Sequence, residues 1–470
     1  MADFDLIVVG GGPAGMAAAR RVREKGLSVA VIDEQQRPGG QILRQPPAVF
    51  RVAGWLAERS YRPVKAELAA FEATQGIAWL GGRSAIGAAR EGDGFVVHAA
   101  GPGDLLRVAG RRLLIAAGCY DLPVPLPGWT LPGVMSAGGV QAFLKSQQIV
   151  PGDRFVLAGT HPLMLIVAAQ IIAAGGEVAV VAFDQPRSRF LPIIARRWTS
   201  ALRHVGTFAA AAGALRLLRR RGVPVRFGLP LRSAHGVASV EEARFDGATV
   251  ACDRIALCYG FVSQSDLPRM LGAGVAWAGP AGGWRTLHDD WMATDAEGLW
   301  IAGETSGVAG AAVALEEGRL AALGILRAAG RIDDAEGAAA PIRRRLAGLR
   351  GFTELLAAVG DPTEALARPN PPETIVCRCE DVTQGAIAAA LADQHAPNAI
   401  KLATRCGMGL CQGRSCEATL LRQIARASGE PEGARGGFTA RFPIRPARIG
   451  DLIESGTVAI EATNSSVHAD

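Results

Sequence analysis

The chain has 470 residues, which suggests roughly three domains at about 150 residues each. Hydrophobic residues make up 49% and charged residues 20%, a balance that excludes a disordered chain. The formal net charge is +6, but aromatic residues are only 6% and no nucleic-acid-binding pattern accompanies the arginines, so we expect no nucleic acid partner.

The sequence predicts no membrane span and no export signal. The first residues lack the positive segment of a signal peptide and run directly into a glycine motif. The longest apolar stretch, residues 163–174, is shorter than the ~20 residues that a transmembrane helix needs. We expect a cytoplasmic protein, and any association with a membrane surface would come through partner subunits.

The first predicted unit is a strand, a glycine turn, a helix and a second strand. Residues 4–9 and 28–32 are apolar, β-rich runs, and residues 16–25 form an alanine- and arginine-rich helix. The turn at residues 10–15 reads Gly-Gly-Gly-Pro-Ala-Gly. A GxGxxG turn between strand and helix places the pyrophosphate of a dinucleotide on the helix N-terminus, so we expect a Rossmann-like nucleotide site.

Each residue of this motif has an expected role. Gly10 permits the tight turn, Gly12 lets the backbone approach the pyrophosphate, and Gly15 lets the helix pack on the strand. Asp33 or Glu34, at the end of the second strand, would accept hydrogen bonds from ribose hydroxyls.

Three further segments favour a flavin over a nicotinamide at this site. Residues 38–41 read Pro-Gly-Gly-Gln, and these glycines allow the backbone to run against a flat ring. Residues 299–304 (LWIAGE) and 114–118 (LIAAG) resemble the AGD and ATG segments of two-dinucleotide flavoproteins. The candidate FAD-binding residues are Gly10, Gly12, Pro13, Ala14, Gly15, Asp33, Glu34, Gly40, Gln41, Ala117, Gly118, Gly303 and Glu304.

A second unit of the same kind departs from the nucleotide-binding pattern. Its strands are expected at residues 154–158 and 178–182, but its turn has Gly159, His161 and Met164 where GxGxxG is needed. A histidine at the second position crowds a pyrophosphate, and a methionine at the third spreads the helix from the strand. We expect a retained scaffold whose nicotinamide site is lost or altered, with His161 satisfied at the helix start.

Five of the eight cysteines fall close together near the C-terminus and predict a metal centre. Cys377 and Cys379, followed by Cys411 and Cys416, supply four thiolates from two short loops. This set suits a [2Fe–2S] cluster or zinc, and the tight Cys-x-Cys pair beside a redox domain favours iron–sulfur. Cys406 with Cys411 would keep the Cys-x4-Cys spacing, but we interpret Cys406 as a packing neighbour. Helix starts at residues 381–383 and after Cys416, and nearby arginines at 378, 405 and 414, would stabilise a negative cluster.

These observations predict an α/β flavoprotein with two dinucleotide-binding domains, like glutathione reductase, and a small helical [2Fe–2S] domain. No Cys-x-x-Cys or Cys-x4-Cys pair occurs in the first 376 residues, which disfavours a disulfide reductase. The expected division is residues 1–110 with 285–330 for the FAD domain, 111–284 for the degenerate second domain, 331–372 for a helix and proline-rich linker, 373–430 for the cluster domain and 431–470 for a tail.

The cysteine motifs, the Pro-Gly-Gly-Gln segment and PGWTLPGV at residues 127–134 carry a family resemblance over nearly the whole chain. The last domain resembles the bacterioferritin-associated-ferredoxin-like [2Fe–2S] domain. The chain as a whole resembles the α subunits of heteromeric dye-linked dehydrogenases, such as those of opine oxidases and of D-hydroxyproline and L-proline dehydrogenases, and the B subunit of hydrogen cyanide synthase. In that family the cluster ligands match Cys377, Cys379, Cys411 and Cys416.

The resemblance implies a division of labour between subunits. Such α subunits work beside a glycine-oxidase-like β subunit that carries its own FAD and oxidises the amino or imino acid, often with a small ferredoxin-like γ subunit. Some relatives hold FMN at the α/β interface, and some carry a different adenine nucleotide in the first site. We therefore expect an electron-transfer subunit without catalytic acid–base residues of its own. The alternatives are a self-sufficient NAD(P)H-dependent reductase and a non-catalytic metal-binding module.

Overall fold

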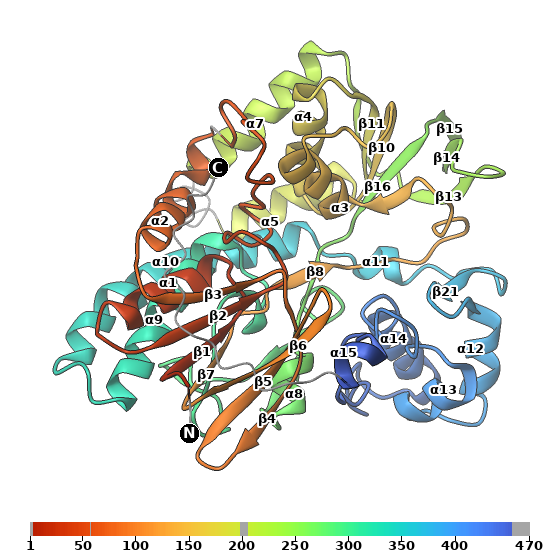
Figure 1. Cartoon of the computed structure of the whole chain (residues 1–470). Coiled ribbons are helices and arrows are strands. Elements are labelled where there is room, and N and C mark those ends of the chain that lie inside the picture. The colour runs from red at the N-terminus through yellow and green to blue at the C-terminus, as the bar shows by residue number, and fades with distance from the viewer. Residues whose placement is uncertain (1–2, 57, 198–204, 454–470) are drawn as a thin grey trace.

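Two parallel five-stranded sheets form the framework of the chain, and a small helical domain lies beside them (Figure 1). The computed structural model describes residues 3–56, 58–197 and 205–453. Both sheets read as short, buried, β-branched runs, as strands covered on both faces do. The first sheet has the order β20-β7-β1-β2-β3, with β1 (Leu6–Val9), β2 (Val29–Asp33), β3 (Ile77–Gly81), β7 (Leu113–Ile115) and β20 (Leu299–Ile301).

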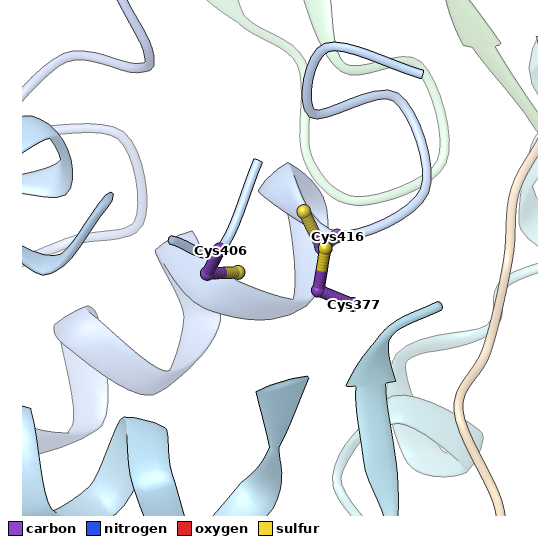
Figure 2. A group of neighbouring side chains, drawn as sticks. All are labelled: Cys377, Cys406 and Cys416. Carbon is purple, nitrogen blue, oxygen red and sulfur yellow. The ribbon is translucent and has the colours of Figure 1, made fainter. Parts of the chain in front are cut away.

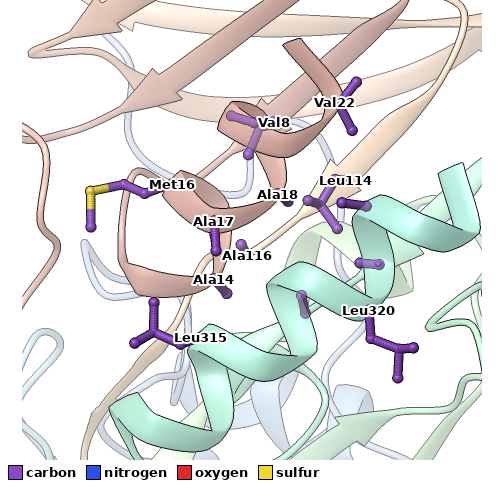
Figure 3. Packing of buried hydrophobic residues seen from close by; sticks show 14 of the residues in the cluster. Val8, Ala14, Met16, Ala17, Ala18, Val22, Leu114, Ala116, Leu315 and Leu320 are labelled. Carbon is purple, nitrogen blue, oxygen red and sulfur yellow. The ribbon is translucent and has the colours of Figure 1, made fainter. Parts of the chain in front are cut away.

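Helices cover one face of the first sheet and a smaller antiparallel sheet covers the other. Helices α1 (Pro13–Arg23) and α9 (Ala311–Ala328) approach closely because α1 presents alanines to its partner (Figure 3). A Cβ added to Gly318 of α9 would lie 2.2 Å from the carbonyl oxygen of Ala14. The opposite face packs on β4 (Ser84–Glu91), β5 (Gly94–Gly101) and β6 (Asp104–Gly110), and α2 (Arg62–Glu72) flanks α1.

The second sheet has the order β12-β11-β10-β16-β9 and confirms the second strand–helix–strand unit. Its strands are β9 (Val134–Ser136), β10 (Arg154–Gly159), β11 (Glu177–Phe183), β12 (Val225–Phe227) and β16 (Arg254–Cys258). One face packs on α3 (Ala137–Ala142), α4 (Leu163–Ala173) and α7 (Val205–Arg220). The other face packs on the sheet of β13 (Leu231–His235), β14 (Glu242–Phe245) and β15 (Ala248–Ala251). Cys252 and Cys258 are buried, as expected.

Short elements join the two sheet domains. Strand β8 (Cys119–Asp121) pairs with β17 (Phe261–Ser263), and β18 (Val275–Trp277) pairs with β19 (Trp284–Thr286). Helices α5 (Phe190–Arg196) and α8 (Asp266–Met270) complete this part. Strand β7 lies just beyond the expected boundary at residue 110 yet pairs with β1, so the first sheet takes a strand from the range expected for the second domain.

From the sequence, residues 330–341 are expected to be a linker, but residues 335–341 are helical. Helix α10 spans Ala335–Val359. It begins at Ala335 because the Asp334 side chain caps it by accepting a hydrogen bond from the Gly337 N–H at 2.8 Å. A short helix, α11 (Thr363–Leu366), follows before the proline-rich stretch. Among the described helices, none has the length and apolarity needed to cross a bilayer.

The C-terminal domain, blue in Figure 1, consists of three helices and a two-stranded ladder around a small core. Its elements are β21 (Ile375–Cys377), β22 (Val382–Thr383), α12 (Gln384–Leu391), α13 (Pro397–Thr404) and α14 (Glu417–Ser428). The chain then returns to the first domain, where the Ile444 N–H donates to the Ile86 carbonyl at 2.8 Å. The last described helix is α15 (Ile449–Ile453), and the rest of the predicted tail, residues 454–470, lies outside the described residues.

Candidate nucleotide pocket and cysteine centre

A cavity of about 380 Å³ lies at the carboxyl edge of the first sheet. Open α/β sheets bind ligands at this edge, because the strand ends and helix N-termini meet there. All the predicted FAD-binding residues except Gly15 line the cavity. They come from four separate segments: the glycine turn, the end of β2 with the Pro-Gly-Gly-Gln loop, the segment after β7 and the segment after β20.

The three motif glycines are required for different physical reasons. Gly10 has φ +106°, and a Cβ there would lie 2.2 Å from the Ala116 carbonyl oxygen. A Cβ on Gly15 would lie 1.8 Å from the Gly10 carbonyl oxygen, so this glycine permits helix and strand to pack. A Cβ on Gly12 meets nothing nearer than the Gly40 Cα at 3.8 Å. Protein packing therefore does not require glycine at 12, whereas close approach of a ligand to the backbone does.

The N-terminus of α1 opens into the same cavity. No side chain caps this end, no acidic residue lies in its first turn, and Pro13 occupies its first position. The unpaired N–H groups and the helix dipole therefore attract an anion. Together with the open face of Gly12, this end of α1 fits a pyrophosphate.

The two candidate ribose-binding acids have different surroundings. Asp33 accepts hydrogen bonds from the Gly11 N–H at 2.6 Å and the Gln35 N–H at 2.7 Å, and burial raises its pKa to about 6. Glu34 is more exposed and pairs with Arg445 of the C-terminal tail at 2.7 Å. Both line the cavity, so both remain candidates for the ribose.

The part of the cavity next to the glycine turn is bordered by the Pro-Gly-Gly-Gln loop and by Glu304. The loop lies against the glycine turn, since a Cβ on Gly40 would be 2.7 Å from the Gly12 Cα. Gln41 is fixed by donating from its side chain to the Cys119 carbonyl at 2.8 Å. The Cys119 thiol donates to the Glu304 carboxylate at 2.7 Å, and burial raises the pKa of both groups. The loop and Glu304 therefore border the cavity where it adjoins the α1 N-terminus.

The turn of the second unit is occupied by its own side chains. The His161 Nδ1 accepts from the Leu163 N–H at 3.2 Å, and its ring meets the edge of Phe261 at a centroid distance of 5.3 Å. Burial lowers the pKa of His161 to about 4, so the ring is neutral at pH 7. His161 thus serves the start of α4, as the sequence predicted, at the place where a pyrophosphate would need room.

The crevice at the carboxyl edge of the second sheet is also filled, by residues 359–368, which begin with the last residue of α10. The Thr160 hydroxyl donates to the Gly360 carbonyl at 2.7 Å, and the Gln185 side chain donates to the Val359 carbonyl at 3.1 Å. Asp184, at the end of β11 where a ribose-binding acid would lie, forms a 2.9 Å ion pair with Arg368. Residues 359–368 therefore occupy the crevice that a nicotinamide dinucleotide would need.

Five cysteines gather in the C-terminal domain. The Sγ atoms of Cys377, Cys406 and Cys416 lie within 4.8 Å of one another, and Figure 2 shows the sulfur of Cys406 directed toward the other two. Hydrogen bonds from the Cys406 and Cys416 thiols lower the pKa of Cys377 to about 2. Cys379 interacts with the backbone N–H and the thiol of Cys411, and these two residues are only partly buried. The gathered thiols are soft ligands that suit iron–sulfur or zinc.

Helices begin beside both cysteine loops, as the sequence predicted. Helix α12 starts after Thr383, whose hydroxyl accepts from the Ala386 N–H, and α14 starts directly after Cys416. The expected arginines surround the centre but have partners of their own. Arg378 lies over the ring of Trp129, and Arg405 pairs with Glu380 at 2.7 Å.

Arg414 connects the cysteine centre with the nucleotide cavity. It lies in the loop between Cys411 and Cys416, its Nη1 donates to the Cys411 carbonyl at 3.3 Å, and the residue lines the cavity. No sequence pattern signals this contact, because Arg414 lies far along the chain from every nucleotide motif. The other lining residues outside the predicted set include Gln141, His161, Gln264, Ile444 and Arg445.

Family comparisons agree with this two-part architecture. Residues 4–318 match the family described as Pyridine nucleotide-disulphide oxidoreductase. Residues 375–426 match the BFD-like [2Fe-2S] binding domain. The first match covers both sheet domains and the second covers the cysteine centre.

The chain is similar over its whole length to subunits of two kinds of enzyme. It is 36% identical to the A subunit of opine oxidase from Rhizobium meliloti, over 97% of this chain and 99% of that protein. It is 33% identical to the HcnB subunit of hydrogen cyanide synthase from Pseudomonas aeruginosa, over 96% of this chain and 99% of that protein. Among solved structures, L-proline dehydrogenase from P. horikoshii shares the fold, with a TM-score of 0.70 and 18% identity over 96% of this chain and 79% of that chain.

Proposed function

The chain belongs to the pyridine nucleotide-disulphide oxidoreductase family, in the group that includes the A subunit of opine oxidase, and we propose that it transfers electrons within a multi-subunit amino-acid or opine dehydrogenase. It is an FAD-dependent oxidoreductase with a C-terminal BFD-like [2Fe–2S] domain. When bound, FAD accepts two electrons together and gives them up singly, whereas a [2Fe–2S] cluster carries one at a time. The residues of this chain set the distance and the electrostatics between the two groups.

For FAD, the proposed contacts follow the cavity from end to end. Gly12, Pro13 and Ala14 would present the α1 N-terminus to the pyrophosphate, and Asp33 or Glu34 would hold the ribose. Gly40 and Glu304 would border FAD next to the pyrophosphate, Gln41 would border the ring end, and the neutral His161 ring would close that end from the second domain. These side chains position the nucleotide and exclude water from it.

For the cluster, we propose Cys377, Cys379, Cys411 and Cys416 as ligands. Two thiol contacts join members of this set, Cys377 with Cys416 and Cys379 with Cys411, and Cys406 contacts Cys377 and Cys416 as well. Each of the two contacts within the set joins one cysteine from each loop, so the four thiolates form two pairs, as two iron atoms require. Cys406 is buried beside the first pair, and we leave it out of the set because the family resemblance assigns the ligands to the other four cysteines.

The shared position of Arg414 is the observation that carries the proposal. The loop between two proposed cluster ligands forms part of the wall of the FAD cavity, so no domain movement is needed to bring the two groups together. The Arg414 Nη2 lies 3.5 Å from the Asp266 carboxylate, which also lines the cavity and holds the loop in place.

The filled crevice of the second domain argues against a self-sufficient NAD(P)H-dependent reductase. Thr160, Gln185 and Asp184 are engaged by residues 359–368, so electrons would have to arrive from another donor. We propose that the donor is a partner subunit that oxidises the substrate and that carries its own FAD, with a glycine-oxidase-like fold. The names of the relatives support a partner, since each is described as a subunit.

Flash reduction of FAD in the anaerobic holoprotein tests the proposal. Flavin absorbance and the EPR signal of the cluster are followed together after the flash. We expect the flavin to reoxidise as the cluster signal grows, and we expect Arg414→Met to slow this step about tenfold, equivalent to about 1.4 kcal/mol. Arg414→Lys should retain most of the rate, and Arg426→Met, an exposed arginine on α14, is the matched control. A cluster that stays oxidised while the flavin remains reduced would contradict the proposal.

A further inference from the structure

A groove of about 620 Å³ runs along the outer side of the cysteine centre. Cys379, one of the two partly buried thiols, forms part of its wall together with Gly409 and Leu410. The opposite wall comes from the tail, at residues 439–446. The groove is separate from the FAD cavity, although Arg445 borders both. It is therefore the place where the proposed cluster would come nearest to the surface.

Large apolar side chains stand exposed at the rim of this groove. Leu402 and Leu410 are each 75% exposed and Phe442 is 50% exposed, and all three line the groove. Exposed apolar residues scattered singly are normal, but three large ones around one groove are typical of a protein interface.

The charges around the groove are mainly positive. Lys401, Arg441 and Arg445 line it, against one carboxylate, Glu380. Glu380 is paired with Arg405 and Arg445 is paired with Glu34, each at 2.7 Å, so Lys401 and Arg441 supply the positive charge of the rim. Arg441 is exposed, and the Lys401 ammonium lies over the ring of Phe438 at 4.9 Å from its centroid. A partner that fits this rim would present acidic side chains around a small apolar patch.

We propose that this groove is the docking site of an acidic, one-electron carrier protein that collects electrons from the cluster. One electron leaves the cluster and one enters the carrier, so no bond changes and no proton moves. The inference rests on the proposed function, because it takes the cysteine centre to be the electron exit. It adds where the carrier binds and which charge the carrier has.

Two small haem proteins of opposite charge serve as probes. The full chain with both cofactors is reduced by dithionite, desalted anaerobically and mixed with acidic cytochrome b5 or basic cytochrome c in a stopped-flow instrument. We expect the rate constant with cytochrome b5 to fall as salt is added, and the rate constant with cytochrome c not to fall. Because dithionite loads the cluster directly, failed transfer from FAD to the cluster would leave this experiment intact.

Variants on the rim separate the apolar from the charged contribution. Leu402→Asn with Leu410→Asn should lower the rate constant with cytochrome b5 about tenfold, and Lys401→Glu with Arg441→Glu should reverse its salt dependence. Leu191→Asn on α5, at 73% exposure, is the matched control and should change nothing. Iron content and the EPR spectrum of the reduced cluster should be equal in all variants, which verifies an intact cluster.

Three results would overturn the proposal. The first is a rate constant with cytochrome b5 that does not fall as salt is added. The second is a leucine double variant that behaves like Leu191→Asn. The third is a dimer of the wild type that the leucine substitutions dissociate, because a second copy of this chain would then be the occupant of the groove.

Discussion

At the scale of single residues, the glycine turn contains one glycine that folding requires and one that ligand binding requires. Gly15 has no room for a side chain, since a Cβ would lie 1.8 Å from the Gly10 carbonyl oxygen. Gly12 has room, with nothing nearer than 3.8 Å, and φ −76° suits any residue. The same motif therefore contains one position fixed by packing and one that faces the cavity.

Alanine substitutions at these two positions should have opposite effects. Gly12→Ala should leave the stability of the apoprotein within about 0.5 kcal/mol of wild type, as surface substitutions usually do, yet abolish FAD retention. Gly15→Ala should destabilise the apoprotein by several kcal/mol, because helix α1 would have to move away from the backbone at Gly10 to make room for the methyl group. Thermal unfolding of the apoproteins and flavin content after purification measure both effects. Equal loss of stability in the two variants would contradict the assignment.

Serine substitutions distinguish the proposed cluster ligands from the cysteine beside them. Cys406→Ser should retain the visible absorbance and iron content, because Cys406 is expected to pack rather than coordinate. Cys379→Ser and Cys411→Ser should each lose most of the iron, since an alcohol is a poor substitute for a thiolate. Iron analysis and EPR of the purified variants decide the matter. Loss of the cluster in Cys406→Ser, with retention in Cys379→Ser, would reassign the ligand set.

His161 predicts a pH dependence of stability. Its pKa is about 4 in the folded protein, below the ordinary value of 6.5, so the unfolded chain binds the proton more readily. The neutral, buried His161 ring therefore makes its full contribution to the free energy of unfolding above pH 6.5. That contribution, about 3 kcal/mol in all, is lost as the pH falls toward 4. His161→Asn, which keeps an acceptor for the Leu163 N–H, should flatten this acid limb in denaturant titrations. His288→Asn is the control, and an unchanged limb in His161→Asn would refute the explanation.

At the scale of elements, two segments that follow the sheet domains determine what each crevice can hold. Residues 359–368 fill the crevice of the second sheet, whereas Ile444 and Arg445 of the tail form part of the wall of the FAD cavity. The Arg445 guanidinium donates to Glu34 at 2.7 Å and to Gln264 at 2.6 Å, so it ties the tail to both domains. Residues 359–368 thus close the nucleotide site of the second domain, and the tail completes the wall of the FAD cavity in the first domain.

Removing the tail contact should weaken FAD binding. Arg445→Ala takes a cation away from the wall of a cavity built for an anionic dinucleotide, and we expect affinity to fall about tenfold, or about 1.4 kcal/mol. Arg448→Ala, an exposed arginine on the same tail, should leave the affinity unchanged. Equilibrium titration of the apoprotein with FAD measures both. Equal affinity in both variants would show that the tail does not contribute.

At the scale of the whole molecule, the sequence predicted what is encoded locally. Strands β1, β2, β10 and β11 and helix α1 follow from periodicity and glycine turns, so their expected and observed bounds lie close together. The start of α10 was missed because its cap, Asp334, stands in a stretch that resembles a linker. The contacts of Arg414 and Arg445 with the FAD cavity could not be predicted, because they depend on how distant parts of the chain pack together.

The central claim is that this chain receives electrons from a partner and not from a nicotinamide nucleotide. Anaerobic titration of the purified holoprotein with NADH and with NADPH, followed by flavin and iron–sulfur absorbance, tests it most directly. Because residues 359–368 fill the second crevice, we expect neither nucleotide to bleach a protein that dithionite does bleach. Rapid, stoichiometric bleaching by either nucleotide would contradict the account and make this chain a reductase in its own right.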